Sequence, residues 1–421
     1  MSQDLMAIGQ RARAAARKMA KASTDAKNRA LLNIADALTE RRDEVLSANK
    51  QDREAGKRNG LDEGLLDRLL LDSERLEALA SDVRGVAALA DPVGEQFDVR
   101  ALPNGLILGR RRVPLGVIGA IYESRPNVTV DIASLCLKSG NAAILRGGSE
   151  AIHSNTTLAG LVREAATSAG LPEDAVQFVE NTDRSLVGQM LSMREYIDLL
   201  IPRGGAGLIR RVAEEASMPA VTGGIGVCHT YIDRGADLTS AVDIAYNAKV
   251  QRPSVCNALD TLLVHTQVAP EYLPRITRAW LEAGVEVHAD GRALSILGPL
   301  EERNILPATD EDWGREFLSL TAAVKVVDSL DEALEHIEKY GSGHTEAVVT
   351  EDYSVAMRFL DEVDAAVVMV NASSRFTDGV QFGLGAEVAI STSKMHARGP
   401  MGLRELTSYK WTVMGSGQVR G

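Results

Sequence analysis

Apolar residues in the first 90 or so positions recur at intervals of three and four, the spacing that places side chains on one face of a helix. Ser73 stands just before the third such run and is a candidate N-cap for it. We therefore expect a layer of helices packed on a larger body. The three apolar faces are Leu5, Ile8, Ala12, Ala15 and Met19; Leu31, Ile34, Ala35 and Leu38; and Leu76, Leu79, Val83 and Val86.

Short apolar runs alternate with helical patterns over the next part of the chain, from about residue 113 to 233. They read GVIGAIY, NAAILRG, AVQFVE, IDLLIPRG and VCHTYID. A second alternating set, from about 258 to 371, reads DTLLVH, GVEVHAD, TAAVKVV, TEAVVT and AAVVMVNA. Such alternation is typical of βαβ units, which build parallel sheets. The pattern therefore predicts an α/β protein with two lobes.

Residues 98–114 do not follow this alternation. Asn104 and Gly105 lie between two apolar runs, and this pair favours a hairpin because both central turn positions need positive φ. The last stretch, from about residue 396, returns to a β-rich composition after a break at glycine and proline. We expect a terminal strand that pairs with the hairpin, in the same subunit or in a partner. The alternative is a tail folded on the body.

Charge and composition exclude several classes of partner. The formal charge of -12 argues against nucleic acid, which needs a basic face, although a local basic pocket for a small phosphate ligand stays compatible with it. No stretch has the ~20 apolar residues that span a bilayer, and the first residues do not form a secretory signal. The three cysteines form no CxxC pair, which suits a reducing cytosol. No cluster has metal-ligand spacing, so no metal is expected.

Two glycine-rich turns follow apolar runs and precede helical patterns. The first contains Arg146, Gly147, Gly148 and Ser149, and the second contains Arg203, Gly204 and Gly205. Glycine lets backbone N–H groups approach an anion, and a helix N-terminus adds a partial positive charge. Each turn alone is equally compatible with a plain tight turn. Both GxGxxG and the P-loop motif are missing from the sequence, so the two turns together favour a phosphate-bearing cofactor of another type.

Cys256 lies between a polar, proline-containing loop and an apolar run, a kind of junction at which reactive groups are often displayed. An inert buried cysteine is the common alternative. Cys136 and Cys228 lie within apolar patterns and are expected in the core. His344 follows a Gly-Ser-Gly turn, where it is either a site residue or a solvated polar side chain.

Long ungapped motifs resemble the gamma-glutamyl phosphate reductase family, also called glutamate-5-semialdehyde dehydrogenases. They include IPRGGAGLIRRV, TGGIGVCHTYID, NAKVQRPSVCNALDTLLVH and VDSLDEALEHIEKYGSGHTEAVV, and the resemblance covers nearly the whole chain. More widely the chain resembles the aldehyde dehydrogenase superfamily. That resemblance implies two Rossmann-like parallel-sheet lobes and a small β element. An NADP-binding domain would take residues 1–97 and 113–250, a catalytic domain 251–375, and an oligomerisation hairpin and strand 98–112 and 395–421.

The resemblance also implies an activity. It is the NADPH-dependent reduction of L-glutamyl 5-phosphate to L-glutamate 5-semialdehyde and phosphate, the second step of proline biosynthesis from glutamate, in the cytoplasm. Cys256 falls where the superfamily keeps its nucleophile, and it would carry the thioester. The family further suggests a homo-oligomer and a possible association with glutamate 5-kinase.

Two departures from the wider superfamily refine this expectation. Oxidising members usually carry a water-activating glutamate before the Gly-Gly pair that stands here as Gly223 and Gly224, whereas this chain has Thr222. Threonine is no general base at neutral pH, so a thioester would survive to receive hydride. The superfamily's cofactor-binding lysine and ribose-binding glutamate appear here as Arg146 and Ser149, which accept a 2′-phosphate rather than repel it. We therefore expect NADPH.

Other site residues follow from matching segments. Asn127 is the candidate oxyanion donor, although a structural role for this loop asparagine is nearly as plausible. Glu316 matches the glutamate that holds the nicotinamide ribose, and its alternative is an ordinary surface acid. The candidates for the substrate's carboxylate and phosphate, which a guanidinium can bind in two-pronged fashion, are Arg125, Arg252, His344, Arg375, Phe376 and Arg398. Arg375 with Phe376 is the first choice for the amino-acid end, against an arginine paired with a nearby acid.

Three rival functions stay open on sequence grounds. The nearest is another oxidoreductase of the superfamily, acting on a free aldehyde or on an acyl-CoA; Thr222 argues against the free aldehyde. A cysteine hydrolase would need a histidine base near Cys256 and no cofactor. A catalytically inactive binding module is disfavoured by Cys256 and the glycine-rich turns.

Overall fold

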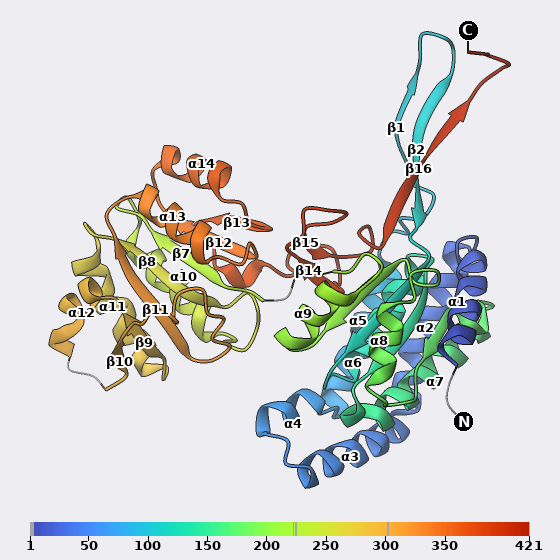
Figure 1. The fold of residues 1–421 in the computed structure, drawn as a ribbon, viewed down its shortest axis with the longest axis horizontal. Helices are drawn as coiled ribbons and strands as arrows, with labels where there is room; N and C mark the ends of the chain where they lie inside the picture. The colour runs from blue at the N-terminus through green and yellow to red at the C-terminus, as the bar shows by residue number, and fades with distance from the viewer. Residues whose placement is uncertain (1–3, 222, 224, 301–302, 421) are drawn as a thin grey trace. The chain divides into compact units, whose positions relative to one another are not determined.

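The computed structural model describes residues 4–221, 223, 225–300 and 303–420. The chain divides into two compact units (Figure 1). Unit 1 takes residues 1–222, 383–389 and 401–421, and unit 2 takes residues 223–382 and 390–400. Both are built on parallel sheets, so the predicted α/β class is confirmed. Among the described residues, no helix combines the length and apolar character needed to cross a bilayer.

The N-terminal part of unit 1 is helical, and the three predicted apolar faces are buried in it. The helix that carries the third predicted face is α5, and it is capped by Asp72, whose carboxylate accepts the Arg75 N–H at 2.8 Å. The prediction of Ser73 as N-cap was therefore wrong by one residue. The helices of unit 1 are α1 (Leu5–Met19), α2 (Thr24–Glu40), α3 (Arg42–Arg58), α4 (Glu63–Leu69), α5 (Ser73–Ala88), α6 (Asn127–Lys138), α7 (Ile152–Ser168), α8 (Ser185–Leu191) and α9 (Ala206–Glu215), with 3₁₀ turns at Ser149–Ala151 and Glu173–Ala175.

The sheet of unit 1 has the order β5-β4-β3-β6, with all neighbours parallel. Its strands are β3 (Val117–Tyr122), β4 (Ala142–Gly147), β5 (Val176–Phe178) and β6 (Leu199–Arg203). The chain runs outward from β3 to β5 and then places β6 on the other side of β3. Ligands of open α/β sheets bind beyond the carboxyl ends of the strands where such a reversal occurs. The reversal here lies between β3 and β6.

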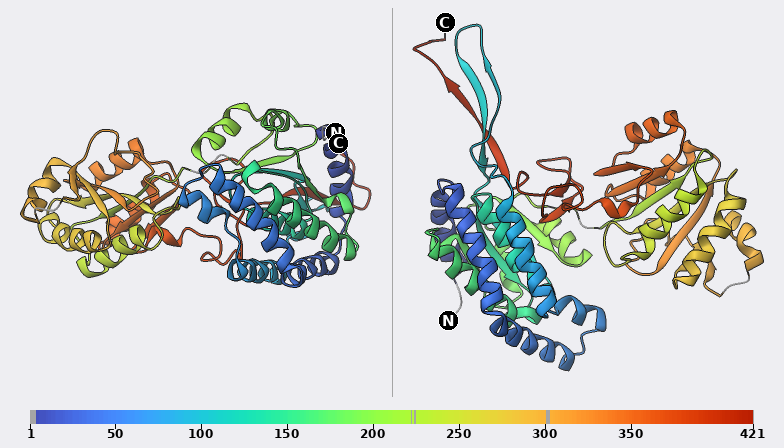
Figure 2. Two further views of the ribbon diagram at one scale, coloured as in Figure 1. Left: turned by 90° about the horizontal axis from the view of Figure 1, so that it is seen from below. Right: turned by 180° about the vertical axis from the view of Figure 1, so that it is seen from behind.

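A three-stranded antiparallel flap belongs to unit 1 and is seen as long paired ribbons in the right view of Figure 2. It has the order β1-β2-β16, with β1 (Gln96–Ala101), β2 (Ile107–Pro114) and β16 (Thr407–Met414). Gly105 has φ +84°, whereas Asn104 is not among the residues with positive φ, and the Gly105 N–H donates to the Leu102 carbonyl oxygen at 2.9 Å. The hairpin is therefore confirmed, but the expectation of positive φ at both Asn104 and Gly105 was wrong for Asn104. The terminal strand β16 pairs with β2 of the same chain. The prediction of a terminal strand that pairs with the hairpin is therefore confirmed, and the alternative of a tail folded on the body is wrong. Oligomerisation through this flap stays a prediction.

Unit 2 contains a seven-stranded parallel sheet of order β10-β9-β11-β8-β7-β12-β13. Its strands are β7 (Cys228–Ile232), β8 (Leu259–His265), β9 (Glu286–Ala289), β10 (Ile305–Pro307), β11 (Thr321–Val327), β12 (Thr345–Val349) and β13 (Val367–Val370). Its helices are α10 (Leu238–Val250), α11 (Ala269–Glu282), α12 (Gly291–Leu297), α13 (Leu330–Tyr340) and α14 (Tyr353–Glu362), with 3₁₀ turns at Gly298–Leu300 and Ser374–Phe376. Strands β14 (Ala389–Ser391) and β15 (Gly399–Met401) pair where the chain passes between the units.

The core of unit 2 explains why its strands read as continuous apolar runs. Both faces of the sheet are covered, and every residue of β7, β8 and β12 is buried. Parallel strands buried on both faces lose the alternation of apolar and polar positions. The central strands β7 and β8 are therefore buried supports, and the loops next to them carry the residues described next.

Candidate functional site

Cys256 is partly exposed in the loop that precedes β8, whereas Cys136 and Cys228 are buried. Burial raises the pKa of both buried thiols, which keeps them protonated and unreactive at neutral pH. The expectation that Cys136 and Cys228 lie in the core is therefore confirmed. Cys256 is the cysteine of this chain that is open to reagents.

The backbone of Cys256 is held closely from behind. A Cβ atom at Gly226 would overlap the Cys256 carbonyl group, so a residue with a side chain is excluded at this position. The buried Cys228 Sγ lies 3.2 Å from the Cys256 carbonyl oxygen and donates to it. The nucleophile loop thus rests on the segment that leads into β7, with no space between them.

Glu316 lies next to this loop on the segment before β11. Its Oε1 accepts the Gly226 N–H at 3.0 Å. Burial raises the pKa of the Glu316 carboxyl, and the hydrogen bond from Gly226 opposes that rise. Glu316 and Cys256 therefore both contact Gly226. The side chain is half-buried, unlike that of an ordinary surface acid.

Arg252 and Arg375 belong to the electrostatic surroundings of Cys256. Burial lowers the pKa of Arg375; the neighbouring charge of Arg252 lowers it further, and Cys256 acts in the opposite direction. Arg375 Nε also donates to Gln251 Oε1 at 3.0 Å, which ties it to the segment that carries Arg252. Phe376, the next residue, is 51% exposed. Two guanidinium groups beside a cysteine suit an anionic substrate.

His344 and Arg398 are placed differently from the substrate contacts expected of them. The His344 ring is fully buried, and burial lowers its pKa to about 4. Its Nδ1 lies 2.8 Å from Thr345 Oγ1 and 3.9 Å from Cys228 Sγ. Arg398 donates to the Asp364 carboxylate at 2.7 Å and to its carbonyl at 3.1 Å. In this arrangement His344 supports the core behind Cys228, and Arg398 is part of an ion pair.

The second group of candidate residues surrounds a cavity in unit 1. The cavity has a volume of about 300 Å³ and lies at the carboxyl ends of β3, β4 and β6, where the strand order reverses. Its position is the one that open α/β sheets use for nucleotides. The polar side chains that line it are Glu123, Arg146, Ser149, Glu150, Arg184 and Arg211.

Arg146 is only 7% exposed and donates to the carbonyl oxygens of Thr182 and Asp183, both at 3.3 Å. Burial lowers the pKa of its guanidinium. This arginine is therefore engaged with the loop after β5 while it also lines the cavity, and its role in cofactor binding stays a prediction. Arg184 follows in that loop and is exposed, as is Ser149 across the cavity. Sequence reasoning missed Arg184, because its position two residues before an apolar pattern carries no motif.

The glycine-rich turns themselves are tightly built. A Cβ at Gly147 would overlap Asn155, and one at Gly148 would overlap the Glu150 carboxylate. In the second turn a Cβ at Gly204 would overlap Glu123.

The acids beside these turns are already held by hydrogen bonds. Glu150 accepts the Ser124 N–H at 2.6 Å, and Glu123 accepts the Gly205 N–H at 3.0 Å. The start of α9 therefore already holds a carboxylate from its own unit.

Asn127 and Arg125 lie in the turn that follows β3. Asn127 is the first residue of α6, and its amide donates to the Asp131 carboxylate at 2.9 Å one turn later. Burial raises the pKa of Asp131 to about 7, and the bond from Asn127 opposes the rise. The role of Asn127 as oxyanion donor and that of Arg125 as substrate ligand stay predictions. Thr222 and Gly224 lie outside the described residues, while Gly223 packs so closely on Ile390 that no side chain fits there.

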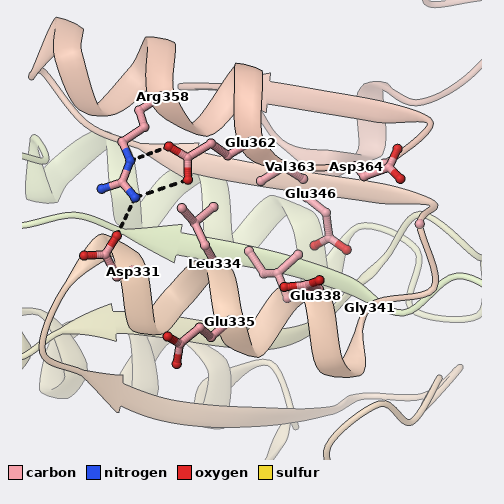
Figure 3. Close-up of a pocket in the computed structure, with 13 residues that line it drawn as sticks. Asp331, Leu334, Glu335, Glu338, Gly341, Glu346, Arg358, Glu362, Val363 and Asp364 are labelled. Carbon is pink, nitrogen blue, oxygen red and sulfur yellow. Dashed lines mark hydrogen bonds and ion pairs between the residues drawn. The ribbon is translucent and has the colours of Figure 1, made fainter.

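A separate cavity of about 510 Å³ lies between α13 and α14 in unit 2 (Figure 3). Carboxylates dominate its lining, but many of them are already paired. Arg358 spans the cavity and binds both Asp331 and Glu362. Asp364 is paired with Lys394 and Arg398. The described residues contain no cluster of metal-ligating side chains, here or elsewhere. We assign this cavity no part in the chemistry at Cys256.

Three features together define a class of protein: the parallel-sheet units, the cavity at the strand-order reversal and the partly exposed loop cysteine, Cys256. Residues 2–305 match the model described as "Aldehyde dehydrogenase family", and the chain belongs to that family. Among its relatives, a gamma-glutamyl phosphate reductase of Dehalococcoides mccartyi is 62% identical over 97% of both chains. One of Roseiflexus castenholzii is 55% identical over 99% of both.

A solved structure agrees with these relatives. The crystal structure of gamma-glutamyl phosphate reductase from Thermotoga maritima is 48% identical, covers 100% of both chains and has a TM-score of 0.96. Within the aldehyde dehydrogenase family, the chain therefore belongs to the gamma-glutamyl phosphate reductases. The recognition made from its motifs is confirmed.

Proposed function

We propose that the protein reduces L-glutamyl 5-phosphate to L-glutamate 5-semialdehyde and phosphate, with NADPH as reductant, in the formation of proline from glutamate. The single observation that carries the proposal is Cys256. It is the partly exposed cysteine, it acts electrostatically on Arg375, which Arg252 also neighbours, and it lies in a chain 62% identical to a gamma-glutamyl phosphate reductase. A free aldehyde or an acyl-CoA as substrate is not favoured by these relatives.

The first step makes a thioester. The Cys256 thiolate attacks the acyl carbon, the carbon–oxygen bond to phosphate breaks, and phosphate leaves with the bonding electron pair. Phosphate is a good leaving group, so this step needs little help from a general acid. Arg252 and Arg375 are the groups we assign to the anionic ends of the substrate, because a guanidinium binds carboxylate or phosphate through two parallel hydrogen bonds.

The second step reduces the thioester. When bound, the reduced nicotinamide supplies hydride to the acyl carbon. The Cys256 N–H and the Asn127 amide are proposed to stabilise the oxyanion of the resulting thiohemiacetal, and each such donor contributes roughly 10²–10³ in rate. Collapse of the adduct releases the aldehyde and restores the thiolate. Because Thr222 replaces a water-activating acid, the thioester is protected from hydrolysis meanwhile.

The cavity of unit 1 fits the adenosine end of a nicotinamide cofactor. It lies at the strand-order reversal, where open α/β sheets bind nucleotides. Its two carboxylates are held by Ser124 and Gly205, whereas Arg184 and Ser149 are exposed. This charge arrangement favours a 2′-phosphate, and hence NADPH over NADH. In unit 2, Glu316 is assigned to the nicotinamide ribose.

The reverse reaction provides the test. Purified protein with NADP⁺, phosphate and glutamate 5-semialdehyde is expected to form NADPH, which is followed by its absorbance. Cys256→Ala is expected to abolish the reaction. Cys136→Ala, which removes a buried cysteine of unit 1, serves as the matched control and is expected to retain it. Activity in Cys256→Ala would disprove the covalent mechanism, and turnover that requires coenzyme A instead of phosphate would disprove the substrate.

A further inference from the structure

A buried carboxylate lies directly behind the nucleophile loop. Asp260, near the start of β8, is 2% exposed. Its Oδ1 accepts the Phe317 N–H at 3.0 Å, and its Oδ2 accepts the Cys228 N–H at 3.4 Å. The two donors belong to different segments, one before β11 and one at the start of β7. A single side chain four residues after Cys256 therefore fastens both segments to the strand that carries the nucleophile.

These contacts close a circuit around Cys256. Phe317 directly follows Glu316, whose carboxylate accepts the Gly226 N–H. Gly226 packs against the backbone of Cys256 with no room for a side chain. Cys228 in turn donates its thiol to the Cys256 carbonyl oxygen. Movement of Asp260 would therefore displace both the Cys228 segment and the Glu316 segment, each of which is linked to Cys256 by these contacts.

The charge of Asp260 is balanced by Lys249 at the end of α10. Lys249 Nζ lies 3.9 Å from Asp260 Oδ1 and donates to the Leu259 carbonyl oxygen at 2.7 Å. Both side chains are almost completely buried. Burial raises the pKa of Asp260 to about 6 and lowers that of Lys249 to about 8, while the attraction between them opposes both shifts.

A buried ion pair is a weak source of stability, because desolvation of the two charges offsets their attraction. An apolar pair of similar volume would avoid this desolvation cost. What an apolar pair lacks is an acceptor for the N–H groups of Phe317 and Cys228. The value of Asp260 thus lies in the two segments that it orders.

We propose that Asp260, neutralised by Lys249, is a positioning residue that sets the Glu316 loop against the Cys256 loop and thereby governs hydride transfer. The inference rests on the proposed function, which gives Cys256 the acyl group and Glu316 the nicotinamide ribose. Asp260 touches neither substrate nor cofactor and acts through these two residues. Displacement of reacting groups by about 1 Å costs on the order of 10²-fold in rate.

Asp233 provides a matched control within the same unit. It follows the other end of β7 and is also 2% exposed. It accepts three backbone or hydroxyl donors, Gly235 N–H at 3.0 Å, Thr350 Oγ1 at 2.9 Å and Tyr231 Oη at 3.1 Å. Asp260→Asn and Asp233→Asn therefore remove the same charge from equally buried sites. A purely structural effect would lower the melting temperature in both variants and change catalysis in neither.

The experiment compares hydride transfer in the full-length wild type and the variants. Asp260→Asn is expected to lower kcat about tenfold to a hundredfold, to raise KM for the nicotinamide cofactor, and to increase the primary isotope effect with 4-deuterated NADPH. Alkylation of Cys256 by iodoacetamide is expected to change less than threefold, because the thiol keeps its exposure. Asp233→Asn is expected to keep the wild-type kinetic constants.

A double variant separates positioning from folding. Lys249→Met with Asp260→Leu removes both buried charges, and we expect it to be more stable than Asp260→Leu alone, in which the buried Lys249 charge has lost Asp260, while kcat stays low. Recovery of kcat together with stability would overturn the proposal, as would an Asp260→Asn variant whose isotope effect and cofactor KM equal those of wild type. Failure of the proposed function itself is distinguishable, because the wild type would then show no NADPH-dependent turnover with this substrate.

Discussion

Gly226 packs against the carbonyl group of Cys256 so closely that the two residues form one layer. We expect Gly226→Ala to displace the nucleophile loop, because the added methyl group meets backbone rather than a flexible side chain. A displacement of this size predicts a fall in kcat of at least about tenfold. Gly291→Ala in the same unit, where a Cβ meets open space, is the control. Equal activity of both variants would contradict this account of the loop.

Arg184 is expected to discriminate between the two nicotinamide cofactors. Loss of a charge-assisted hydrogen bond to a 2′-phosphate costs about 1.5–3 kcal/mol, so Arg184→Ala should raise KM for NADPH about tenfold to a hundredfold. KM for NADH should stay within about twofold, since that cofactor lacks the phosphate. Steady-state kinetics with both cofactors measures the difference, and Arg42→Ala at an exposed surface pair is the control. A parallel rise for both cofactors would move the 2′-phosphate to another residue.

Arg375 is expected to bind the substrate rather than to stabilise the fold. Arg375→Ala should raise KM for glutamate 5-semialdehyde about tenfold or more, and Arg375→Lys should recover only part of it, because an ammonium group lacks the planar fork of guanidinium. Arg358→Ala, which removes a more exposed arginine from the cavity between α13 and α14, should leave KM unchanged. If Arg375→Ala lowers the melting temperature without changing KM, the assignment is wrong.

Buried histidine makes the protein less stable in mild acid. The pKa of His344 is lowered by burial to about 4, against an ordinary value of about 6.5 in the unfolded chain. Between these two pKa values the unfolded state therefore binds more protons than the folded state. The contribution of His344 to the free energy of unfolding is fully present above pH ~6.5 and is lost as the pH falls toward 4. The loss is up to about 1.4 kcal/mol for each pH unit.

Raised carboxyl pKa values act in the opposite direction, so the histidine effect must be isolated. Burial raises the pKa of Asp131 to about 7 and that of Asp260 to about 6, and the folded state keeps these protons. We therefore expect the difference in unfolding free energy between wild type and His344→Asn to shrink from pH 7 to pH 5 in urea titrations. A difference independent of pH would show that His344 does not titrate on unfolding.

Local signals predicted the architecture well. The Asn104-Gly105 pair predicted the hairpin correctly, although only Gly105 adopts positive φ. Uninterrupted apolar runs predicted the strands of both parallel sheets, because strands buried on two faces show no alternation. Cys256 was distinguished from Cys136 and Cys228 by its polar flank, and the structure gives the three cysteines the expected burial.

Contacts between distant segments could not be read from the sequence. Arg146 stood next to glycines like a phosphate ligand, yet its side chain is buried against the carbonyl groups of Thr182 and Asp183. The Glu123 carboxylate, on another loop, accepts a hydrogen bond from the Gly205 N–H. Asp260 lies within an apolar run, and its importance appears only when three segments meet. Each depends on tertiary packing, which no local pattern records.

The proposed mechanism requires a thioester on Cys256 that water does not hydrolyse, and a burst measurement detects this intermediate. The enzyme, NADP⁺ and glutamate 5-semialdehyde are mixed without phosphate, and NADPH absorbance is recorded together with the mass of the Cys256 peptide. The account predicts a burst of about one NADPH for each active subunit, a glutamyl adduct on Cys256, and steady turnover once phosphate is added. Continuous NADPH formation without phosphate, or an unmodified Cys256 after the burst, would contradict it.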